Sequence, residues 1–158
     1  MIERSASMPM GAELAAYQVV DDGAGNPLRV LGNAVGTLRA NSALTTNMNG
    51  IVLGNPNCKG LLLYVNVTTP VAGTTPTLQL RVNAIDPITG TAFPIWTPAA
   101  LNPPVANTEY VYAMYPAALA GSFTAFLNNI LPRSWSVDLL VTGAGVSVPM
   151  SLGYGLLT

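Results

Sequence analysis

The stretch RSWSVDLLVTGAGVSVPMSLGYGLL, residues 133–157, contains two of the segments in this chain that have a strand pattern. Apolar side chains alternate with polar or small ones on both sides of its central glycines, and this period of two is that of a β-strand with one buried face. Ser136 and Asp138 fall on the expected outer face. The tetrapeptide TGAG at 142–145 predicts a tight hairpin between two antiparallel strands. The expected inward residues are Trp135, Val137, Leu139, Val141, Val146, Val148, Met150, Leu152, Tyr154 and Leu156.

The same period recurs earlier in the chain, in KGLLLYVNVT at 59–68 and TLQLRVNAI at 77–85. NTEYVYAMYP at 107–116 and the proline-bounded FPIWTP at 93–98 predict two further strands. Roughly six or seven strands in one domain are typical of an antiparallel β-sandwich, jelly-roll or immunoglobulin-like, so the expected fold class is all-β. The expected inward residues are Leu61, Leu63, Val65 and Val67, and Leu78, Leu80, Val82 and Ala84.

Two segments depart from the strand pattern. PAALAGSFTAFLNNIL at 116–131 has apolar residues at helical spacing, which predicts one short helix near residues 117–130 across an end of the sandwich. Residues 1–49 have no sustained period, and we expect an extended N-terminal arm or long loops there, followed by a sandwich domain over residues 50–158. An arm of this kind becomes ordered by lying on another surface.

The loop IDPITG at 85–90 is either a ligand loop or a corner between strands. Pro87 fixes φ, Asp86 can accept hydrogen bonds from the backbone that follows it, and Gly90 supplies a positive φ. Because each residue has a local backbone role, we expect a hairpin connection rather than a site.

Charged residues are scarce. They make up 8% of the chain, against roughly a quarter in typical soluble domains, and the net charge of −1 gives little repulsion between copies. One interpretation is that other subunits cover much of the surface, as in a homo-oligomer, and the other is an exposed surface rich in Thr, Asn, Ser and Gly. The six Lys and Arg residues are spread along the chain, so nucleic-acid binding has no electrostatic support.

The sequence also shows no membrane signal. No apolar run approaches the roughly eighteen residues of a membrane span. The first residues, MIERSASMPMGAELAAYQ, lack the basic start and apolar core of a signal peptide. We therefore expect a soluble protein made in the cytoplasm, with no membrane partner.

Residue types that carry catalysis or bind metals are few. The chain has no histidine, which removes the commonest general base and nearly all zinc sites, and Cys58 is its one cysteine. Among the seven acidic residues the sequence places only Asp21 and Asp22 together, in a Gly-rich turn that lacks the EF-hand calcium spacing. We expect no catalytic, cofactor or metal site, and a protein that is not an enzyme.

The aromatic residues leave one binding function open. On a β-sandwich, Phe93, Trp96, Tyr110, Tyr112 and Tyr115 could form a platform on which sugars stack, as in a carbohydrate-binding module. Alternating Tyr and Trp on strands more often serve core and cross-strand packing, which is the interpretation that we favour.

An ordered set of short motifs lies between residues 58 and 157. The chain there resembles a group of small tailed-bacteriophage proteins from the structural gene region. The group's pattern is an aliphatic strand ending in Val-Thr, then Thr-Pro-Thr-Leu, Asp-Pro-x-Thr-Gly, an aromatic segment, Tyr-Pro and Leu-Pro-Arg-x-Trp-x-Val. In this chain the elements are Val67-Thr68, Thr75–Leu78, Asp86–Gly90, Phe93–Trp96, Tyr115-Pro116 and Leu131–Val137.

The resemblance implies a virion structural protein, and among such roles a capsid decoration (cement) protein. Proteins of this kind bind the outer capsid surface, with the major capsid protein as partner, and stabilise the joints between capsomers. They are typically homo-oligomers, often trimers, so the expected location is the capsid surface of the virion after synthesis in the host cytoplasm. A tail, baseplate or head-fibre component is the alternative within the same class.

Overall fold

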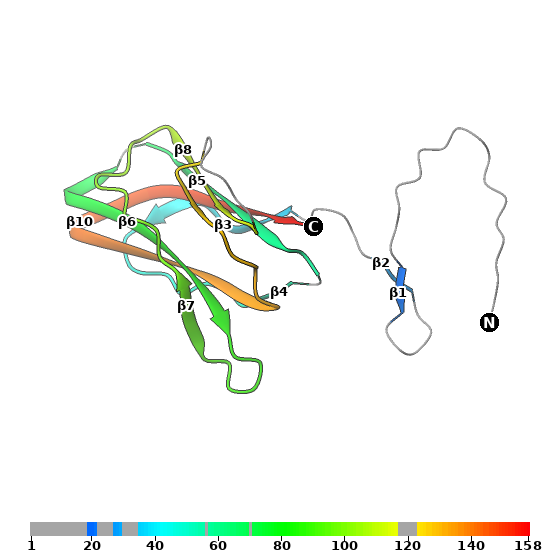
Figure 1. Ribbon diagram of the computed structural model, residues 1–158. Coiled ribbons are helices and arrows are strands. Elements are labelled where there is room, and N and C mark those ends of the chain that lie inside the picture. The colour runs from blue at the N-terminus through cyan, green and yellow to red at the C-terminus, as the bar shows by residue number, and fades with distance from the viewer. Residues whose placement is uncertain (1–18, 22–26, 30–34, 56, 70, 117–122) are drawn as a thin grey trace, which may run out of the picture. The chain divides into compact units, whose positions relative to one another are not determined.

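The computed structural model of the protein describes residues 19–21, 27–29, 35–55, 57–69, 71–116 and 123–158. The chain divides into two compact units, Met1–Leu31 and Gly32–Thr158. In the first unit, β1 (Val19–Asp21) pairs antiparallel with β2 (Pro27–Arg29). The described part of the second unit is all-β (Figure 1), with β3 (Val35–Leu44), β4 (Leu53–Gly54), β5 (Gly60–Val67), β6 (Ala72–Ile85), β7 (Ala92–Trp96), β8 (Thr108–Met114), β9 (Ala125–Leu127) and β10 (Ser134–Leu157).

Strand β10 is the centre of one curled sheet with the order β7-β6-β10-β5-β8-β9. Its first part pairs with β6, from Trp135↔Ala84 onward, and its second part pairs with β5, up to Leu157↔Gly60. Figure 1 shows these two parts as the orange and red segments of a single strand. On the opposite edge of β10, β4 lies beside the first part and β3 beside the second.

The hairpin expected at residues 142–145 is therefore wrong, because the chain continues as one strand of 24 residues through this point. The two separate sheets of a sandwich are likewise not confirmed, since β10 joins both halves into a single eight-stranded sheet. The all-β prediction is confirmed, and the strand pairs are antiparallel except for β8 with β9.

Glycines allow β10 and β6 to bend together where the sheet curls. The register between the strands shifts on both sides of Ala144, and Gly143 has a φ of +125°, which L side chains rarely adopt. A Cβ on Gly143 would lie 2.8 Å from the carbonyl oxygen of Thr74, and one on Gly73 would lie 2.9 Å from the Cα of Val146. Bulges of this kind bend a strand and increase its twist. The glycines thus form a corner inside a continuous strand.

The core lies within the curl and is built from the predicted faces. Each inward residue of β5 has no exposed surface, and Trp135 is completely buried although it is the largest side chain of the core. Burial of this apolar surface is the main favourable term in forming the sheet. The fully buried side chains include Leu61, Leu63, Val65, Val67, Leu78, Val82, Met114, Trp135, Leu139, Val148, Met150 and Leu152.

The helix expected near residues 117–130 is not seen in the described part of that range, and residues 117–122 lie outside it. Instead, β9 pairs parallel with β8, and the backbone N–H of Thr124 donates to the carbonyl oxygen of Val111. Phe126 and Ile130 remain exposed by 40% and 63%, so the helical spacing of apolar residues does not create a buried face. The strand edge of β8 provides hydrogen-bond partners that this short segment takes up instead.

The expected domain boundary at residue 50 is also too late in the chain. β3 belongs to the sheet, because it pairs with β10 from Leu44↔Val148 to Val35↔Gly155. The sequence of β3 does not predict a strand, because its apolar and polar residues alternate only weakly. As an edge strand, β3 buries only part of its side chains.

We predict that Gly143→Ala lowers the free energy of unfolding by about 2 kcal/mol or more, because a Cβ there meets backbone and an unfavourable φ. Gly145→Ala is the matched control, since Gly145 has a φ of +63° and open space around its Cβ position; its cost is about 1 kcal/mol. Urea unfolding of both variants measures the difference. Equal losses for the two variants would contradict the corner assignment.

Candidate functional site: a polar network on strand β10

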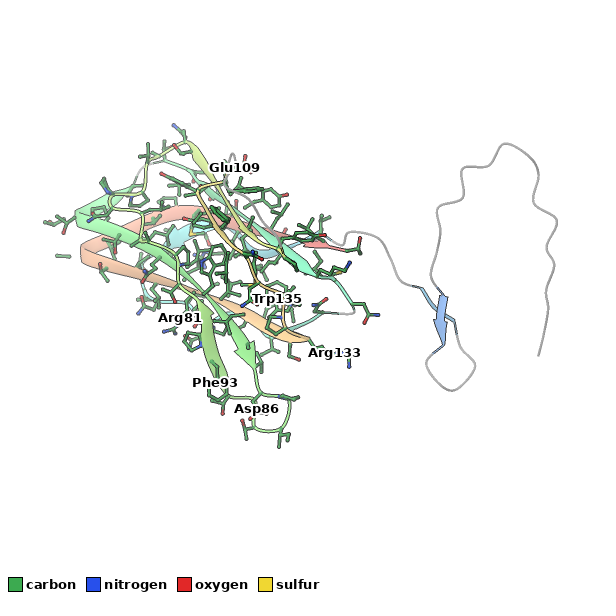
Figure 2. The ribbon with its side chains drawn as sticks, viewed as in Figure 1. Arg81, Asp86, Phe93, Glu109, Arg133 and Trp135 are labelled. Atoms are coloured by element: carbon green, nitrogen blue, oxygen red, sulfur yellow. The ribbon has the colours of Figure 1, made fainter. Side chains whose placement is uncertain are left out.

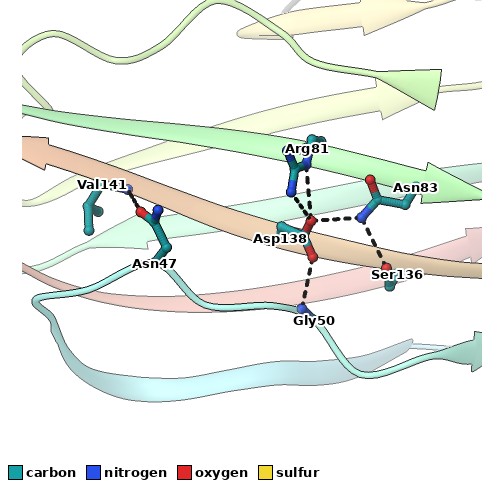
Figure 3. A network of polar contacts seen from close by, with 7 residues as sticks. All are labelled: Asn47, Gly50, Arg81, Asn83, Ser136, Asp138 and Val141. Atoms are coloured by element: carbon teal, nitrogen blue, oxygen red, sulfur yellow. Dashed lines mark hydrogen bonds and ion pairs between the residues drawn. The ribbon is translucent and has the colours of Figure 1, made fainter. Parts of the chain in front are cut away.

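Two polar side chains in the first half of β10, Ser136 and Asp138, are buried, contrary to the sequence expectation. Ser136 and Asp138 lie on the outer face of the sheet as predicted, yet they are only 3% and 5% exposed, and Asn83 beside them on β6 is 1% exposed. Figure 3 shows that these residues form one network with Arg81 and with the segment at residues 47–54, which we call the strap. The network is the most site-like cluster of polar groups among the described residues.

Asp138 is the centre of this network. Its Oδ2 accepts hydrogen bonds from Arg81 Nε at 3.0 Å and Nη2 at 2.7 Å, and from Asn83 Nδ2 at 2.9 Å. Its Oδ1 accepts the backbone N–H of Gly50 at 3.0 Å. Asn83 Nδ2 also donates to Ser136 Oγ at 3.1 Å. Both carboxylate oxygens are therefore used by the protein itself.

This environment keeps Asp138 ionised. Burial alone would raise the pKa of the carboxyl, but hydrogen bonds from Gly50, Arg81 and Asn83 and the charge of Arg81 together hold the pKa below its usual value of 3.8. The side chain of Arg81 is 34% exposed and that of Asp138 is 8% exposed, so the ion pair lies at the boundary of the core. A charge-neutral pair with every carboxylate oxygen bonded has the features of a structural element rather than of a general base.

The strap runs along the edge of β10 and pairs with it irregularly. Met48 exchanges backbone hydrogen bonds of 2.8 and 2.9 Å with Leu139, and Leu53 pairs with Trp135 further along. Between these pairs four strap residues (49–52) oppose three residues of β10 (136–138), which is the count of a β-bulge. Gly50 lies directly against the backbone of Val137, where no Cβ would fit.

Side chains replace backbone partners around this bulge. Asn47 Oδ1 accepts the N–H of Val141 at 2.8 Å, and the Asp138 carboxylate accepts the N–H of Gly50. These two bonds satisfy donors that a regular ladder would pair with carbonyl oxygens. The network thus attaches the strap to the sheet.

The Asp86 loop has the structure expected from the sequence. The Asp86 carboxylate accepts the N–H of Ile88 at 2.8 Å and the hydroxyl of Thr89 at 2.7 Å, and these bonds lower its pKa. Gly90 has a φ of +72°, and its N–H donates to the carbonyl oxygen of Asp86. The loop connects β6 to β7 as a hairpin, at whose far end Figure 2 places Asp86 and Phe93.

The aromatic residues do not gather into one exposed platform. The rings of Trp96 and Tyr112 pack edge to face with centroids 6.3 Å apart, and Tyr112 is 1% exposed. Burial, together with the neighbouring Tyr110, raises the pKa of Tyr112 to about 12. Phe93 is 54% exposed on β7. The packing interpretation accounts for Trp96 and Tyr112, and the carbohydrate-binding alternative gains no support from this geometry.

The remaining sequence candidates have local roles or lie outside the described residues. Cys58 is buried, which raises the pKa of its thiol. The carbonyl oxygen of Arg133 accepts the N–H of Asn55. Asp22 lies outside the described residues, so the Asp21–Asp22 pair is not placed.

The described residues contain neither a candidate metal site nor a candidate membrane-spanning helix. No three His, Cys, Asp or Glu side chains gather there in a way that could hold a metal ion. No helix in the described ranges is long and apolar enough to cross a membrane.

Comparisons with known proteins find similarity only to solved structures. No protein-family model matches the chain, and no curated protein matches it. Among solved structures, a chain from the infectious bursal disease virus Gt strain is 12% identical with a TM-score of 0.42, over 87% of this chain and 37% of that one. A chain from the Gx strain is 13% identical with a TM-score of 0.40, over 78% and 28%. A Bacillus endospore appendage chain is 15% identical with a TM-score of 0.40, over 80% and 90%.

We predict that Arg81→Met makes the protein more sensitive to acid. Because the folded pKa of Asp138 is lowered, the ionised carboxylate stabilises the fold above its usual pKa of 3.8 and this stabilisation is lost as the pH falls through the folded pKa. Without Arg81 the burial of Asp138 is less compensated, so its pKa rises and stability is lost at a higher pH. Urea unfolding over a pH series measures this shift.

Arg133→Met is the matched control, since it removes the same charge from an exposed position. An unchanged pH dependence in Arg81→Met, or the same shift in both variants, would show that the ion pair does not set the acid response.

Proposed function

We propose that the chain is a structural protein of a tailed-bacteriophage virion and not an enzyme, and that its specific role is capsid decoration. In this role it binds the outer capsid surface through contacts with the major capsid protein and stabilises the joints between capsomers. The observation that carries the proposal is the ordered motif set from Val67-Thr68 to Leu131–Val137. It occurs on a charge-poor all-β unit.

Several motifs have roles in this fold that do not require a ligand. Asp86–Gly90 closes the β6–β7 hairpin through its own hydrogen bonds. In Leu131–Val137, the N–H of Leu131 donates to the carbonyl oxygen of Lys59, and Trp135 fills the core. Motifs that specify a scaffold rather than a reaction are consistent with a structural protein.

The composition of the exposed surface supports the proposal that other subunits cover this protein. Large apolar side chains are exposed on several elements of the second unit, while few charges are available to keep single copies apart. Protein interfaces derive most of their affinity from apolar cores surrounded by a polar rim. The residues concerned are Val35, Ile51, Val52, Ile88, Phe93, Val105, Phe123, Phe126 and Ile130.

In this proposal the chain acts by adding interface area where capsomers meet. An interface of the usual size buries about 800 Å² on each partner, and many equivalent joints on a capsid multiply this contribution. Homo-oligomers, with trimers at threefold positions, would place several such surfaces together. A tail, baseplate or head-fibre component would use the same kind of surface at far fewer positions.

The number of copies per virion separates these roles. We expect quantitative mass spectrometry of purified particles to find this chain in hundreds of copies, because decoration proteins occupy repeated positions of the capsid lattice. A count between a few and a few dozen would assign the chain to the tail, baseplate or fibres.

Particle stability provides a second test. Particles that lack this chain should release their DNA at a lower temperature than complete particles, and addition of the purified full chain should restore the original temperature. Loss of adsorption to the host with unchanged heat resistance would instead indicate a fibre component.

A further inference from the structure

We propose that the Asp138 carboxylate fixes the strap (residues 47–54) to β10, and that the strap detaches when this one carboxylate loses its charge while the rest of the sheet stays paired. This attachment is a property of the fold and does not depend on the proposed virion role. It gives the fold a segment that opens in acid.

The strap is held by fewer backbone bonds than the strands around it. Its ladder consists of the Met48–Leu139 pair and the short strand β4, with the bulge at Gly50 between them. In contrast, β5 is paired along almost its whole length on both edges, with β10 and with β8. Segments with the fewest such contacts are those that open locally at the lowest free-energy cost. The strap therefore depends on its side-chain bonds more than β5 does.

Asp138 supplies the charged bond at the centre of the strap. The N–H of Gly50, opposite the interrupted part of the ladder, donates to Asp138 Oδ1 at 3.0 Å (Figure 3). The other attachment, from Val141 N–H to Asn47 Oδ1, involves two neutral groups. Hydrogen bonds to an ionised group are about twice as strong as neutral ones. Removing the charge thus weakens the strap at the point where its backbone pairing is already broken.

No other group in this region titrates in acid. The strap, NMNGIVLG, contains no ionisable side chain, and residues 134–142 of β10 contain only Asp138. From β6, the guanidinium of Arg81 and the neutral amide of Asn83 face the carboxylate. Since neither the strap nor this part of β10 contains another acidic side chain, an acid response of the strap is the response of Asp138.

Detachment would change what the protein presents to its neighbours. The strap carries Ile51 and Val52, which are 63% and 57% exposed, and it covers the edge of β10 between Trp135 and Val141. Without the strap, backbone groups along this edge lose their partners. An unpaired strand edge is a position at which another chain can add a strand.

Hydrogen–deuterium exchange of the full chain tests the proposal through Asp138→Asn at neutral pH. We expect the strap to exchange about tenfold faster or more than in the wild type, with β5 (Gly60–Val67) unchanged. Ser136→Ala is the matched control, because it removes a member of the network that has no hydrogen bond to the strap, and it should leave strap exchange unchanged. An unaffected strap in Asp138→Asn, or equal loss of protection in strap and β5, would overturn the proposal.

A pH series on the wild type keeps the test decisive if Asp138→Asn does not fold. The carboxylate is ionised above its usual pKa of 3.8 and is neutralised only below that value. After correction for intrinsic exchange rates, strap protection should fall as the pH is lowered from 3.8 through the folded pKa of Asp138, while β5 remains protected. Protection that is constant in the strap, or lost together with that of β5, would show that Asp138 does not act as a separate attachment.

Discussion

The unbroken course of β10 through both halves of the curled sheet is the constraint on which the rest of the structure depends. β5 and β6 follow one edge of this strand, while β3, the strap and β4 follow the other. β6 pairs with β10 on both sides of the bend and must therefore bend with it. The corner therefore requires backbone conformations and close approaches that Gly143 and Gly73 permit and that other residues would resist. The apolar core, with Trp135 at its centre, fills the space that the bend encloses.

Local pattern was sufficient to predict the strand faces and the β6–β7 loop. The inward residues of β5 and β6 can be predicted from the period of two, because a strand with one buried face has an apolar residue at every second position. Asp86, Pro87 and Gly90 determine their loop through bonds within a few residues, so the hairpin prediction needed no distant information. The loop prediction was confirmed, and the predicted inward residues of β5 and β6 are buried except for Ala84, which is half-buried beside the buried Asn83.

The wrong predictions involve long-range pairing. The segment TGAG has the same appearance in a hairpin and in a bulged strand, since both need glycines at positive φ, and only the partner strand distinguishes them. The spacing of apolar residues around β9 predicts a helix, because this local pattern contains no information about the edge of β8 with which β9 pairs. Asp138 was placed on the correct face but was expected to be exposed, and it is covered by a segment 88 positions away in the sequence. No local signal marks Gly50 as its partner.

The carboxylate of Asp138 is satisfied by partners within the chain, whereas the exposed apolar residues of the charge-poor surface are available to other proteins. The central claim is that these residues are covered in the assembled virion. Oxidative footprinting of the free chain and of intact particles tests it most directly at Ile51, Ile88 and Phe93, which are 63%, 92% and 54% exposed. The account predicts that at least one of these positions loses most of its reactivity in the particle. Equal reactivity of all three in the free chain and in the particle would contradict it.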